Sequence, residues 1–490
     1  MEECPALNLI RELCKALDLE GIVYCHWKST AALDCSARGD NDLDLLVSRR
    51  DIRRFTEILH RLGFKEARAP SEREVTGIVN YYGYDRAADK LVHVHAHYQL
   101  VLGDDMTKNY HLPLEQPYLD SAVQAGIFKI PVPEFELIVF IIRMVLKHMT
   151  WDAILSRQAR LPKAARRELE YLQAQANPTR MGEILRQHLP DVDLLLFDRC
   201  MLSLRPDSST WMRINVGQKL QKALRAYARR PPASDSLLKL WRRGIGAVRR
   251  RVLKRLARKR MAGGGAMIAL VGGDGAGKST AAEELYRWLS KNFSTIRVHM
   301  GRPDWSWTTI AVRGAVKLGR RLGLFPHPHS VKELASTGTA AAFPGYPALL
   351  LEACVARDRY LTYARAHRFA LAGSLAICDR YPLPQLTLMD SQRIEQMVKA
   401  ERTHALIKLL LRLEERYYQS IAPPDLLIVL KIDPEIAVRR KTSEDSESVR
   451  SRCQEIWDVD WQSTSAHVID AGRSQAEVLL DLKSLIWSKL

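Results

Sequence analysis

The chain has 490 residues, 47% of them hydrophobic and 27% charged, a composition typical of a soluble globular protein with roughly two to four domains. None of its eight cysteines forms a C-x-x-C pair, so neither a zinc ribbon nor a redox motif is indicated, and unpaired cysteines favour a reducing cytoplasm. The N-terminus lacks a signal-peptide pattern, and the most apolar run, Leu137–Leu146, is broken by Arg143 and too short to span a bilayer. We therefore expect a cytoplasmic protein and not an integral membrane protein.

The formal net charge of +18 is concentrated in one segment of the chain. Between Val216 and Arg260 lie sixteen Lys and Arg residues and one acidic residue, Asp235, which gives this segment a net charge of +15. The rest of the chain is nearly neutral, so the basic character has to be explained for this segment alone.

The first 210 residues divide into an alternating part and a helical part. Residues 1–130 alternate helix and strand patterns, and residues from Pro133 to about Leu204 are mostly helical. We predict an α/β domain over residues 1–130 and a helical domain over residues 131–210. The elements predicted in the first part are helices over Leu7–Leu17 and Asp51–Leu62 and strands over Ile22–Trp27, Leu43–Val47 and Val92–Val101.

Two carboxylates stand at the start of the predicted strand Leu43–Val47. Asp42 and Asp44 are two residues apart, so both side chains project from one face of the strand. Carboxylates at this spacing can hold divalent metal ions for two-metal nucleotidyl transfer. We therefore predict Asp42 and Asp44 as catalytic residues and metal ligands.

This pattern resembles the D-x-D strand of the nucleotidyltransferase superfamily, which includes proteins with a helical domain after the α/β core. The resemblance covers roughly residues 15–200 and rests on one short motif. The superfamily usually has Gly-Ser before the motif, where this chain has Lys28-Ser29. Three interpretations stay open: active nucleotidyl transfer, a binding domain of the same fold, and an unrelated turn.

The third carboxylate that this superfamily often needs on a later strand has no counterpart here. The predicted strand reads Val92-His93-Val94-His95-Ala96-His97, and alternation places His93, His95 and His97 on one face. These histidines either bind a metal ion or line a polar groove.

Residues 211–265 are predicted to be a basic linker with one amphipathic helix. Its apolar stripe, with Lys and Arg on the remaining faces, fits a helix that docks on a neighbouring domain. Contact of residues 236–260 with an anionic membrane surface is the alternative, and nucleic acid is the least expected partner because no recognised motif accompanies the charge. The stripe comprises Leu237, Trp241, Ile245, Val248, Val252 and Leu256.

A phosphate-binding motif opens the predicted C-terminal domain, residues 266–490. The apolar strand Met267–Val271 runs into a loop with the pattern G-x-x-x-x-G-K-[ST], and a helical pattern follows at once. This strand–loop–helix context is the one in which backbone N–H groups bind the phosphates of ATP, the lysine reaches the β- and γ-phosphates and the serine binds Mg²⁺. The loop residues are Gly272, Gly273, Asp274, Gly275, Ala276, Gly277, Lys278, Ser279 and Thr280.

Two later strands of this domain end in residues suited to phosphate chemistry. Leu375–Cys378 leads to Asp379 and Arg380, and an Asp at the carboxyl end of a parallel strand faces the same crevice as the loop. Asp379 is predicted to hold Mg²⁺ and Arg380 to bind a phosphate. The strand Leu426–Ile432 precedes a helix with Arg439 and a polar stretch, which fits a lid over ATP.

Together these segments resemble thymidylate kinase and its relatives among the nucleoside monophosphate kinases. The resemblance implies a five-stranded parallel sheet flanked by helices. It also implies that Asp274, Arg359 and Arg380 face the phosphate acceptor and that Arg439 stabilises the transferred phosphoryl group. The matching pieces are GGDGAGKST, ARDRY (Ala356–Tyr360), CDRY (Cys378–Tyr381), PDLLIVLKIDPEIAVRRK (Pro424–Lys441) and VIDAGRSQAEV (Val468–Val478).

The acceptor side departs from that family. Thymidylate kinases have a Glu-Pro-Gly-Gly-type loop after the second strand, whereas here Thr295–Met300 leads to Gly301–Trp305 and to about forty residues with no counterpart, including four basic ones. We predict a kinase that uses ATP and Mg²⁺, acts on a small-molecule acceptor other than dTMP and is joined to a nucleotidyltransferase-like domain. The alternatives are an authentic thymidylate kinase and an ATP-binding scaffold that docks on membranes through the basic helix. A homodimer stays open. The four basic residues are Arg313, Lys317, Arg320 and Arg321.

Overall fold

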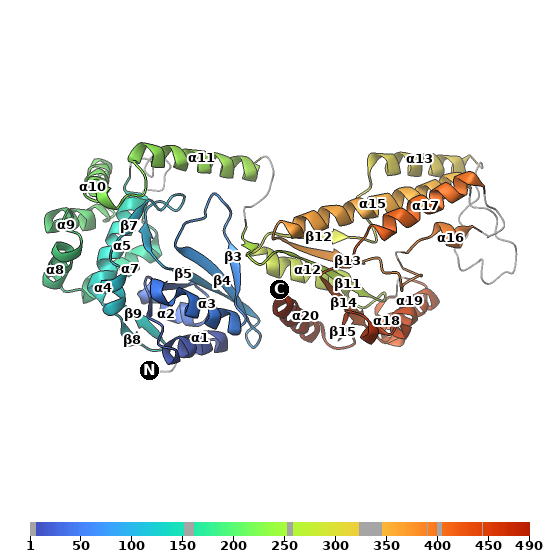
Figure 1. The fold of residues 1–490 in the computed structure, drawn as a ribbon, viewed down its shortest axis with the longest axis horizontal. Coiled ribbons are helices and arrows are strands. Elements are labelled where there is room, and N and C mark those ends of the chain that lie inside the picture. The colour runs from blue at the N-terminus through green and yellow to red at the C-terminus, as the bar shows by residue number, and fades with distance from the viewer. Residues whose placement is uncertain are drawn as a thin grey trace. The chain divides into compact units, whose positions relative to one another are not determined.

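The computed structural model describes residues 6–150, 161–251, 258–322, 345–389, 391–398, 404–442 and 444–490. The chain forms two compact units, Met1–Ala262 and Gly263–Leu490, each described by itself below (Figure 1). Within the described residues, no helix is both long enough and apolar enough to cross a membrane.

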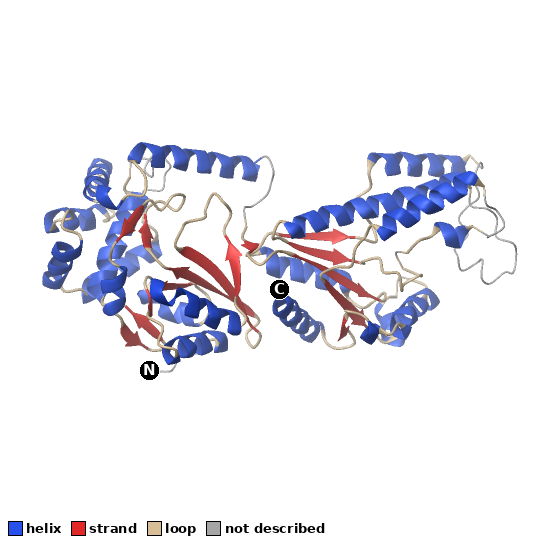
Figure 2. Ribbon diagram, viewed as in Figure 1, coloured by secondary structure: helices blue, strands red, loops and turns tan. Residues whose placement is uncertain are grey.

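Unit 1 is built on a mixed six-stranded sheet with the order β1-β2-β5-β4-β3-β10. Strands β2 and β5 run parallel, and every other neighbouring pair is antiparallel (Figure 2). The predicted strand Leu43–Val47 is confirmed, whereas β3, β4 and β10 were not predicted. The strands are β1 (Tyr24–His26), β2 (Leu43–Val47), β3 (Lys65–Arg68), β4 (Ile78–Asp85), β5 (Lys90–His97) and β10 (Arg260–Met261).

The two faces of this sheet have different roles. On one face, Leu43, Leu45 and Val47 pack with α1 (Asn8–Leu19) and α3 (Ile52–Arg61) in a closed apolar core. Because side chains alternate along a strand, Asp44 and Leu46 lie on the other face, where Leu46 joins the core of the helical region. The second face is therefore polar around Asp44, which lies opposite His95, and apolar around Leu46.

The helical region surrounds α5, whose side chains are buried at nearly every position. The predicted strand Val92–Val101 is wrong in its extent, because the chain turns after His97 and a separate strand, β6, begins at Leu100. Residues 211–224 lie mostly in α10. The helix contributes Val216 and Leu220 to the same core, and its C-cap residue, Leu224, belongs to that core as well. The other elements are α2 (Leu33–Ala37), α4 (Glu115–Asp120), α5 (Pro133–His148), α7 (Lys163–Gln175), α8 (Pro178–His188), α9 (Leu194–Ser203), α10 (Thr210–Ala223), α11 (Pro232–Arg251), β6 (Leu100–Leu102), β7 (Tyr110–Leu112), β8 (Val123–Ala125), β9 (Phe128–Ile130), and the 3₁₀ turns Thr30–Ala32, Arg49–Asp51 and Arg225–Tyr227.

Helix α11 contacts the rest of unit 1 through its charged side. Arg243 pairs with Asp104 at 2.7 Å, and Arg249 pairs with Glu72. The predicted apolar stripe points away from these contacts, with Leu237 68%, Trp241 62% and Val248 54% exposed. At these three positions the stripe does not pack against the rest of unit 1, and its docking on a neighbouring domain stays a prediction. Val252 and Leu256 lie outside the described residues.

Unit 2 contains a five-stranded sheet in which all strands are parallel, in the order β12-β13-β11-β14-β15. Helices α13, α15 and α17 lie on one side of this sheet and α12 and α20 on the other (Figure 1). The predicted five-stranded parallel sheet is confirmed. The elements are β11 (Ala266–Gly272), α12 (Lys278–Ser290), β12 (Thr295–His299), α13 (Trp307–Arg321), α15 (Tyr346–Leu371), β13 (Leu375–Asp379), α16 (Ile394–Met397), α17 (Ala405–Gln419), β14 (Leu426–Lys431), α18 (Pro434–Arg440), α19 (Ser446–Asp458), the 3₁₀ turn Trp461–Ser463, β15 (His467–Asp470) and α20 (Gln475–Lys489).

Candidate functional site

The phosphate-binding motif forms the tight loop between β11, the central strand, and α12. Gly275 and Gly277 adopt left-handed backbone angles, with φ of 82° and 79°, which residues other than glycine rarely adopt. A Cβ atom on Gly273 would collide with Cys453 Sγ. The loop can therefore keep its shape only with glycines at these places, and it ends at the N-terminus of α12, where an anion is favoured.

Lys278 is the first residue of α12 and lies under the loop. Its ammonium donates a hydrogen bond to the carbonyl oxygen of Gly273 at 2.6 Å. Burial, reinforced by the nearby charge of Arg380, lowers the pKa of Lys278 to about 8, although Asp274 and Asp379 oppose the shift. A buried ammonium in a loop of N–H donors is suited to binding an anion.

Ser279 and Asp379 meet although they are 100 residues apart in the sequence. Ser279 donates a hydrogen bond from Oγ to Asp379 Oδ2 at 2.8 Å, because β11 and β13 are parallel neighbours whose carboxyl ends lie at one edge of the sheet. The other oxygen of the same carboxylate, Asp379 Oδ1, is buried and has no hydrogen-bond partner. A buried carboxylate oxygen without a partner is costly. A hydrated Mg²⁺ ion held by Ser279 and Asp379 fits this arrangement.

Asp274, in the middle of the loop, is held by two arginines. Its Oδ1 accepts a hydrogen bond from Arg380 at 3.1 Å and its Oδ2 accepts one from Arg452 at 2.5 Å. Burial by itself would raise the pKa of Asp274, but the bond from Arg452 and the charges of Lys278 and Arg380 hold it below its usual value. Three cationic groups therefore converge on the loop.

Arg380 has φ of 62°. That conformation is strained for a residue with a side chain and occurs often at functional sites.

The other two arginines predicted for this site lie differently. Arg359 on α15 is buried and donates hydrogen bonds to the carbonyl oxygen of Met300, at 2.9 Å, and to the hydroxyl of Tyr418. Met300 follows β12 directly, so the guanidinium of Arg359 lies at the carboxyl edge of the sheet. Arg439, near the end of α18, is exposed.

In unit 1, the two predicted carboxylates face the histidines of the neighbouring strand. Asp44 lies opposite His95 in the parallel pairing of β2 and β5. His95 Nδ1 is 3.0 Å from Asp44 Oδ1, and the ammonium of Lys28 is 2.8 Å from the same oxygen. His93 Nδ1 lies 2.7 Å from Asp42. The three histidines and both carboxylates therefore occupy one face of the sheet.

Charges around Asp44 determine its ionisation. Burial alone would raise the pKa of Asp44, but the Lys28 ammonium, the hydrogen bond from His95 and the neighbouring imidazoles hold it well below its usual value. Burial lowers the pKa of His95 to about 4 and that of His97 well below its usual range. Burial alone would raise the pKa of Asp42 as well, but the hydrogen bond and charge of His93 lower it, so at neutral pH this face presents two carboxylates and neutral imidazoles.

Two further lysines flank this face. Burial, followed by the charge of Lys28, lowers the pKa of Lys108 to about 8. Lys259, which directly precedes β10, donates to the hydroxyl of Tyr82 at 2.6 Å and lies 3.5 Å from His93 Nε2.

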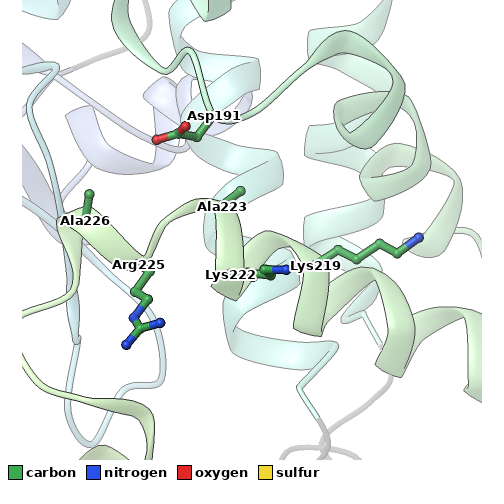
Figure 3. A pocket seen from close by; sticks show the side chains of 6 residues that line it. All are labelled: Asp191, Lys219, Lys222, Ala223, Arg225 and Ala226. Atoms are coloured by element: carbon green, nitrogen blue, oxygen red, sulfur yellow. The ribbon is translucent and has the colours of Figure 1, made fainter.

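A separate surface pocket lies on the helical region of unit 1. It is lined by Lys219, Lys222 and Arg225 together with Asp191 and two alanines. Figure 3 shows the basic side chains extending in different directions and not toward a common point. This pocket contains none of the residues predicted to be catalytic.

The sequence prediction missed several residues at the two sites. At the phosphate-binding loop these residues are Arg452 and Cys453, both on α19. Around Asp44 they are Lys28, in the irregular segment before β2, and Lys108, in the irregular segment before β7. Arg450 and Arg452 were interpreted as basic residues flanking the polar stretch of the predicted lid, but nothing in their spacing indicates that Arg452 contacts Asp274. In the sequence, Lys28 was noted only because it stands where the nucleotidyltransferase superfamily usually has glycine, and nothing indicated a contact with Asp44.

No protein-family model matches the chain. Over 221 residues, 44% of this chain and 83% of the relative, it is 28% identical to YghR of Escherichia coli strain K12, which is described as an uncharacterized ATP-binding protein. The same protein of E. coli O6:H1 strain CFT073 matches to the same extent. A solved structure of thymidylate kinase from Candida albicans matches with 18% identity and a TM-score of 0.27, over 46% of this chain and 91% of that one. On its parallel five-stranded sheet and its loop, unit 2 has a P-loop NTPase-like fold.

Proposed function

We propose that unit 2 is a phosphotransferase that uses ATP and Mg²⁺ to phosphorylate a small molecule. The observation that carries the proposal is the meeting of Ser279 with Asp379 beside the glycine loop, with one buried oxygen of Asp379 left without a partner. A loop that binds phosphates and a carboxylate placed for a divalent ion are the two parts that phosphoryl transfer needs on the donor side. The similarity to a relative described as ATP-binding supports ATP as the donor.

Each residue of the loop has a distinct task in this proposal. The backbone N–H groups between Gly273 and Lys278 bind the phosphate oxygens, and the ammonium of Lys278 exchanges the carbonyl of Gly273 for the β- and γ-phosphates. When bound at Ser279 and Asp379, Mg²⁺ neutralises phosphate charge and orients the triphosphate. Arg380 contributes a second positive charge close to the transferred group.

The acceptor is proposed to lie at the carboxyl edge of the sheet, near Asp274, Arg359 and Arg380. Asp274 already contacts Arg380, so it can orient that guanidinium or accept a hydrogen bond from an acceptor hydroxyl. Arg359 is committed to Met300 and Tyr418, and we assign it the role of shaping this edge. Arg439 is exposed and is proposed to reach the γ-phosphate when the lid closes.

The test is an acceptor screen with the full-length chain. The protein is incubated with γ-labelled ATP and Mg²⁺ together with nucleoside monophosphates, sugars, polyols and their phosphates, and transfer of label is measured. We expect transfer to an acceptor other than dTMP, and a fall in transfer of about 10²–10³ in Lys278→Met. Turnover of dTMP at about 1–100 s⁻¹ would instead establish the thymidylate kinase alternative. Steady ATP binding with no labelled product would favour the scaffold alternative.

For unit 1, nucleotidyl transfer remains a proposal that rests on Asp42 and Asp44. Their placement on one face supports it, whereas the ion pair between Lys28 and Asp44 places an ammonium where a metal ion would bind in that chemistry. The screen is therefore repeated with α-labelled ATP, in which nucleotidyl transfer moves the label to the acceptor and phosphoryl transfer leaves it in ADP. Label in a product other than ADP or AMP with the wild-type chain, and its absence with Asp42→Asn, supports nucleotidyl transfer.

A second proposed role is peripheral contact with an anionic membrane through α11. The specific observation is the exposed stripe of Leu237, Trp241 and Val248 within a segment of net charge +15. Exposed apolar side chains in a strongly basic segment match the chemistry of an anionic lipid surface. We expect the full-length chain to sediment with vesicles containing phosphatidylserine and Trp241→Glu to sediment less. Trp211→Glu, at an exposed tryptophan of α10, is the matched control. Equal sedimentation of the three proteins would exclude this role.

A further inference from the structure

Three side-chain atoms converge on one point of the polar face of unit 1. Asp44 Oδ1, His95 Nδ1 and His97 Nε2 belong to the neighbouring strands β2 and β5. Their separations are 3.0 Å between Asp44 and His95, 3.3 Å between His95 and His97 and 3.9 Å between His97 and Asp44. All three atoms are potential metal ligands, and none of them belongs to the phosphate-binding loop.

At most a shared proton can link these three atoms by hydrogen bonding. A neutral imidazole nitrogen either carries one proton and donates, or has a lone pair and accepts. If His95 Nδ1 carries the proton, it divides it between Asp44 Oδ1 and the lone pair of His97 Nε2 in one three-centre bond. If it accepts from His97, its lone pair faces the carboxylate oxygen at 3.0 Å. A metal ion at the common point is the arrangement in which each of the three atoms directs a lone pair toward a cation.

The spacing also matches a coordination shell. Ligand atoms about 2.0–2.1 Å from a zinc ion, at tetrahedral angles, lie about 3.3 Å from one another. Two of the three observed separations are within a few tenths of an ångström of this value, and the third is longer. A small rotation of a side chain would close the set on an ion.

The backbone and the surrounding packing hold the ligands in place. His95 and His97 are two residues apart on β5 and so share a face, and the strand pairing brings Asp44 directly opposite His95. His97 is completely buried, its ring packs edge-on against Trp27 at 4.8 Å, and its Nδ1 has no hydrogen-bond partner. This packing holds the ring with Nε2 toward His95 and Asp44, the orientation in which Nε2 can bind an ion.

We propose that Asp44, His95 and His97 form a binding site for one divalent transition-metal ion, with Zn²⁺ as the best match. Two imidazole nitrogens and one carboxylate oxygen are the ligands that Zn²⁺ and its neighbours prefer, whereas Mg²⁺ and Ca²⁺ prefer oxygen alone. A three-ligand set leaves a coordination position open for water or a substrate. This site differs from the predicted pair Asp42 and Asp44, since Asp42 is bonded to His93.

Lys28 determines how tightly the ion is held. Its ammonium lies 2.8 Å from the same oxygen of Asp44 that the ion needs, so the ion and the ammonium compete. The side chain of Lys28 is 21% exposed and can turn toward solvent when the ion enters. Replacing Lys28 with Met should therefore tighten metal binding, which a purely structural role of this ion pair would not produce.

The experiment uses the full-length chain, freed of metal by a chelator and kept free of nucleotide so that the phosphate-binding loop does not take up a cation. Co²⁺ is the spectroscopic probe, and Zn²⁺ is titrated by calorimetry. We expect one ion per chain and a visible Co²⁺ spectrum typical of nitrogen and oxygen ligands. His95→Gln should weaken binding about 100-fold or more, and Lys28→Met should strengthen it about tenfold.

His93→Gln is the matched control, because it changes a histidine of the same strand and face that pairs with Asp42 and not with Asp44. The control should keep the stoichiometry and the Co²⁺ spectrum. Equal affinity of the wild-type chain, His95→Gln and His93→Gln, or weaker binding by Lys28→Met, would overturn the proposal. Because Lys28→Met removes no ligand, its result stands even if His95→Gln fails to fold.

Discussion

The two polar sites of this protein are built in opposite ways. The site of unit 2 is made largely of backbone, with a glycine loop at the end of the central strand of a parallel sheet and a few side chains gathered at the same edge. The site of unit 1 is made of side chains that stand on the face of a mixed sheet, Asp44 opposite His95 and His97 beside it. The first can surround a large anion such as a triphosphate, whereas the second closes on a point the size of one ion.

Because of this difference, the two sites depend to different degrees on single side chains. In the loop, several N–H groups share the binding of phosphate, and only Lys278, Ser279 and Asp379 contribute indispensable side chains. In the strand site, each of the three ligands carries a large part of the binding. We therefore expect that a substitution at one site abolishes binding there and leaves binding at the other site unchanged. Four predictions follow, from the largest expected effect to the smallest.

Replacing Lys278 with Met should have the largest effect. The substitution removes a buried ammonium that contacts the transferred phosphates, so phosphoryl transfer should fall by about 10²–10³, while Co²⁺ binding to unit 1 stays unchanged. Steady-state transfer to the acceptor found in the screen measures the first effect and the visible spectrum the second. Lys291→Met, at an exposed lysine at the end of the same helix, is the control. Normal transfer by Lys278→Met would contradict the assignment of the loop.

Replacing Asp379 with Asn should raise the Mg²⁺ concentration that phosphoryl transfer requires. The amide can still accept the bond from Ser279, but it loses the negative charge and the unpartnered oxygen, so the affinity for Mg²⁺ should fall about 10–100-fold. Transfer measured against Mg²⁺ concentration gives this shift, and Asp458→Asn on the exposed face of α19 serves as the control. An unchanged Mg²⁺ requirement would place the ion elsewhere.

The pH dependence of ATP binding should reveal the buried lysine. Burial lowers the pKa of Lys278 to about 8, and bound phosphates stabilise the ammonium and raise that pKa. Binding above pH 8 must therefore take up one proton, and the Kd for ATP should rise about tenfold per pH unit. Below about pH 7 the lysine is already charged, so this slope should vanish. Calorimetry of the wild-type chain across this range measures the slope, and a Kd that stays constant above pH 8 would contradict its assignment to Lys278.

The smallest expected effect concerns the stability of unit 2 alone. Ser474 and Glu477 form a capping box at the start of α20, and Ser474→Ala should lower the free energy of unfolding by about 1 kcal/mol. For a unit of this size that corresponds to a shift of about 2–4 °C in Tm. Scanning calorimetry should show the shift in the transition that MgATP stabilises and not in the one that Zn²⁺ stabilises. A shift in both would show that the units unfold together.

The sequence was most informative where the residues of a site follow one another along the chain. The loop residues, the strand before them and the helix after them follow from one motif, and the five-stranded parallel sheet was implied by the resemblance to the nucleoside monophosphate kinases. The contact of Asp274 with Arg452 could not be predicted, because 178 residues separate the two and only the fold brings α19 to the loop.

In unit 1 the alternation of β5 placed the three histidines on one face, and the spacing of Asp42 and Asp44 did the same for the carboxylates. Which strand lies beside which depends on the sheet topology, and β4 was missed because Asn80 and Gly83 interrupt its apolar pattern. The sequence therefore indicated both halves of the strand site without showing that Asp44 faces His95. Helix α11 shows the same limit, since its stripe was visible but the direction of that stripe was not.

Calorimetric titration of the full-length chain with ATP, with and without Mg²⁺, tests the central claim most directly. The proposed function predicts one ATP per chain, bound more tightly when Mg²⁺ is present, and loss of this binding in Lys278→Met. Binding that is indifferent to Mg²⁺ and unchanged in Lys278→Met would contradict it.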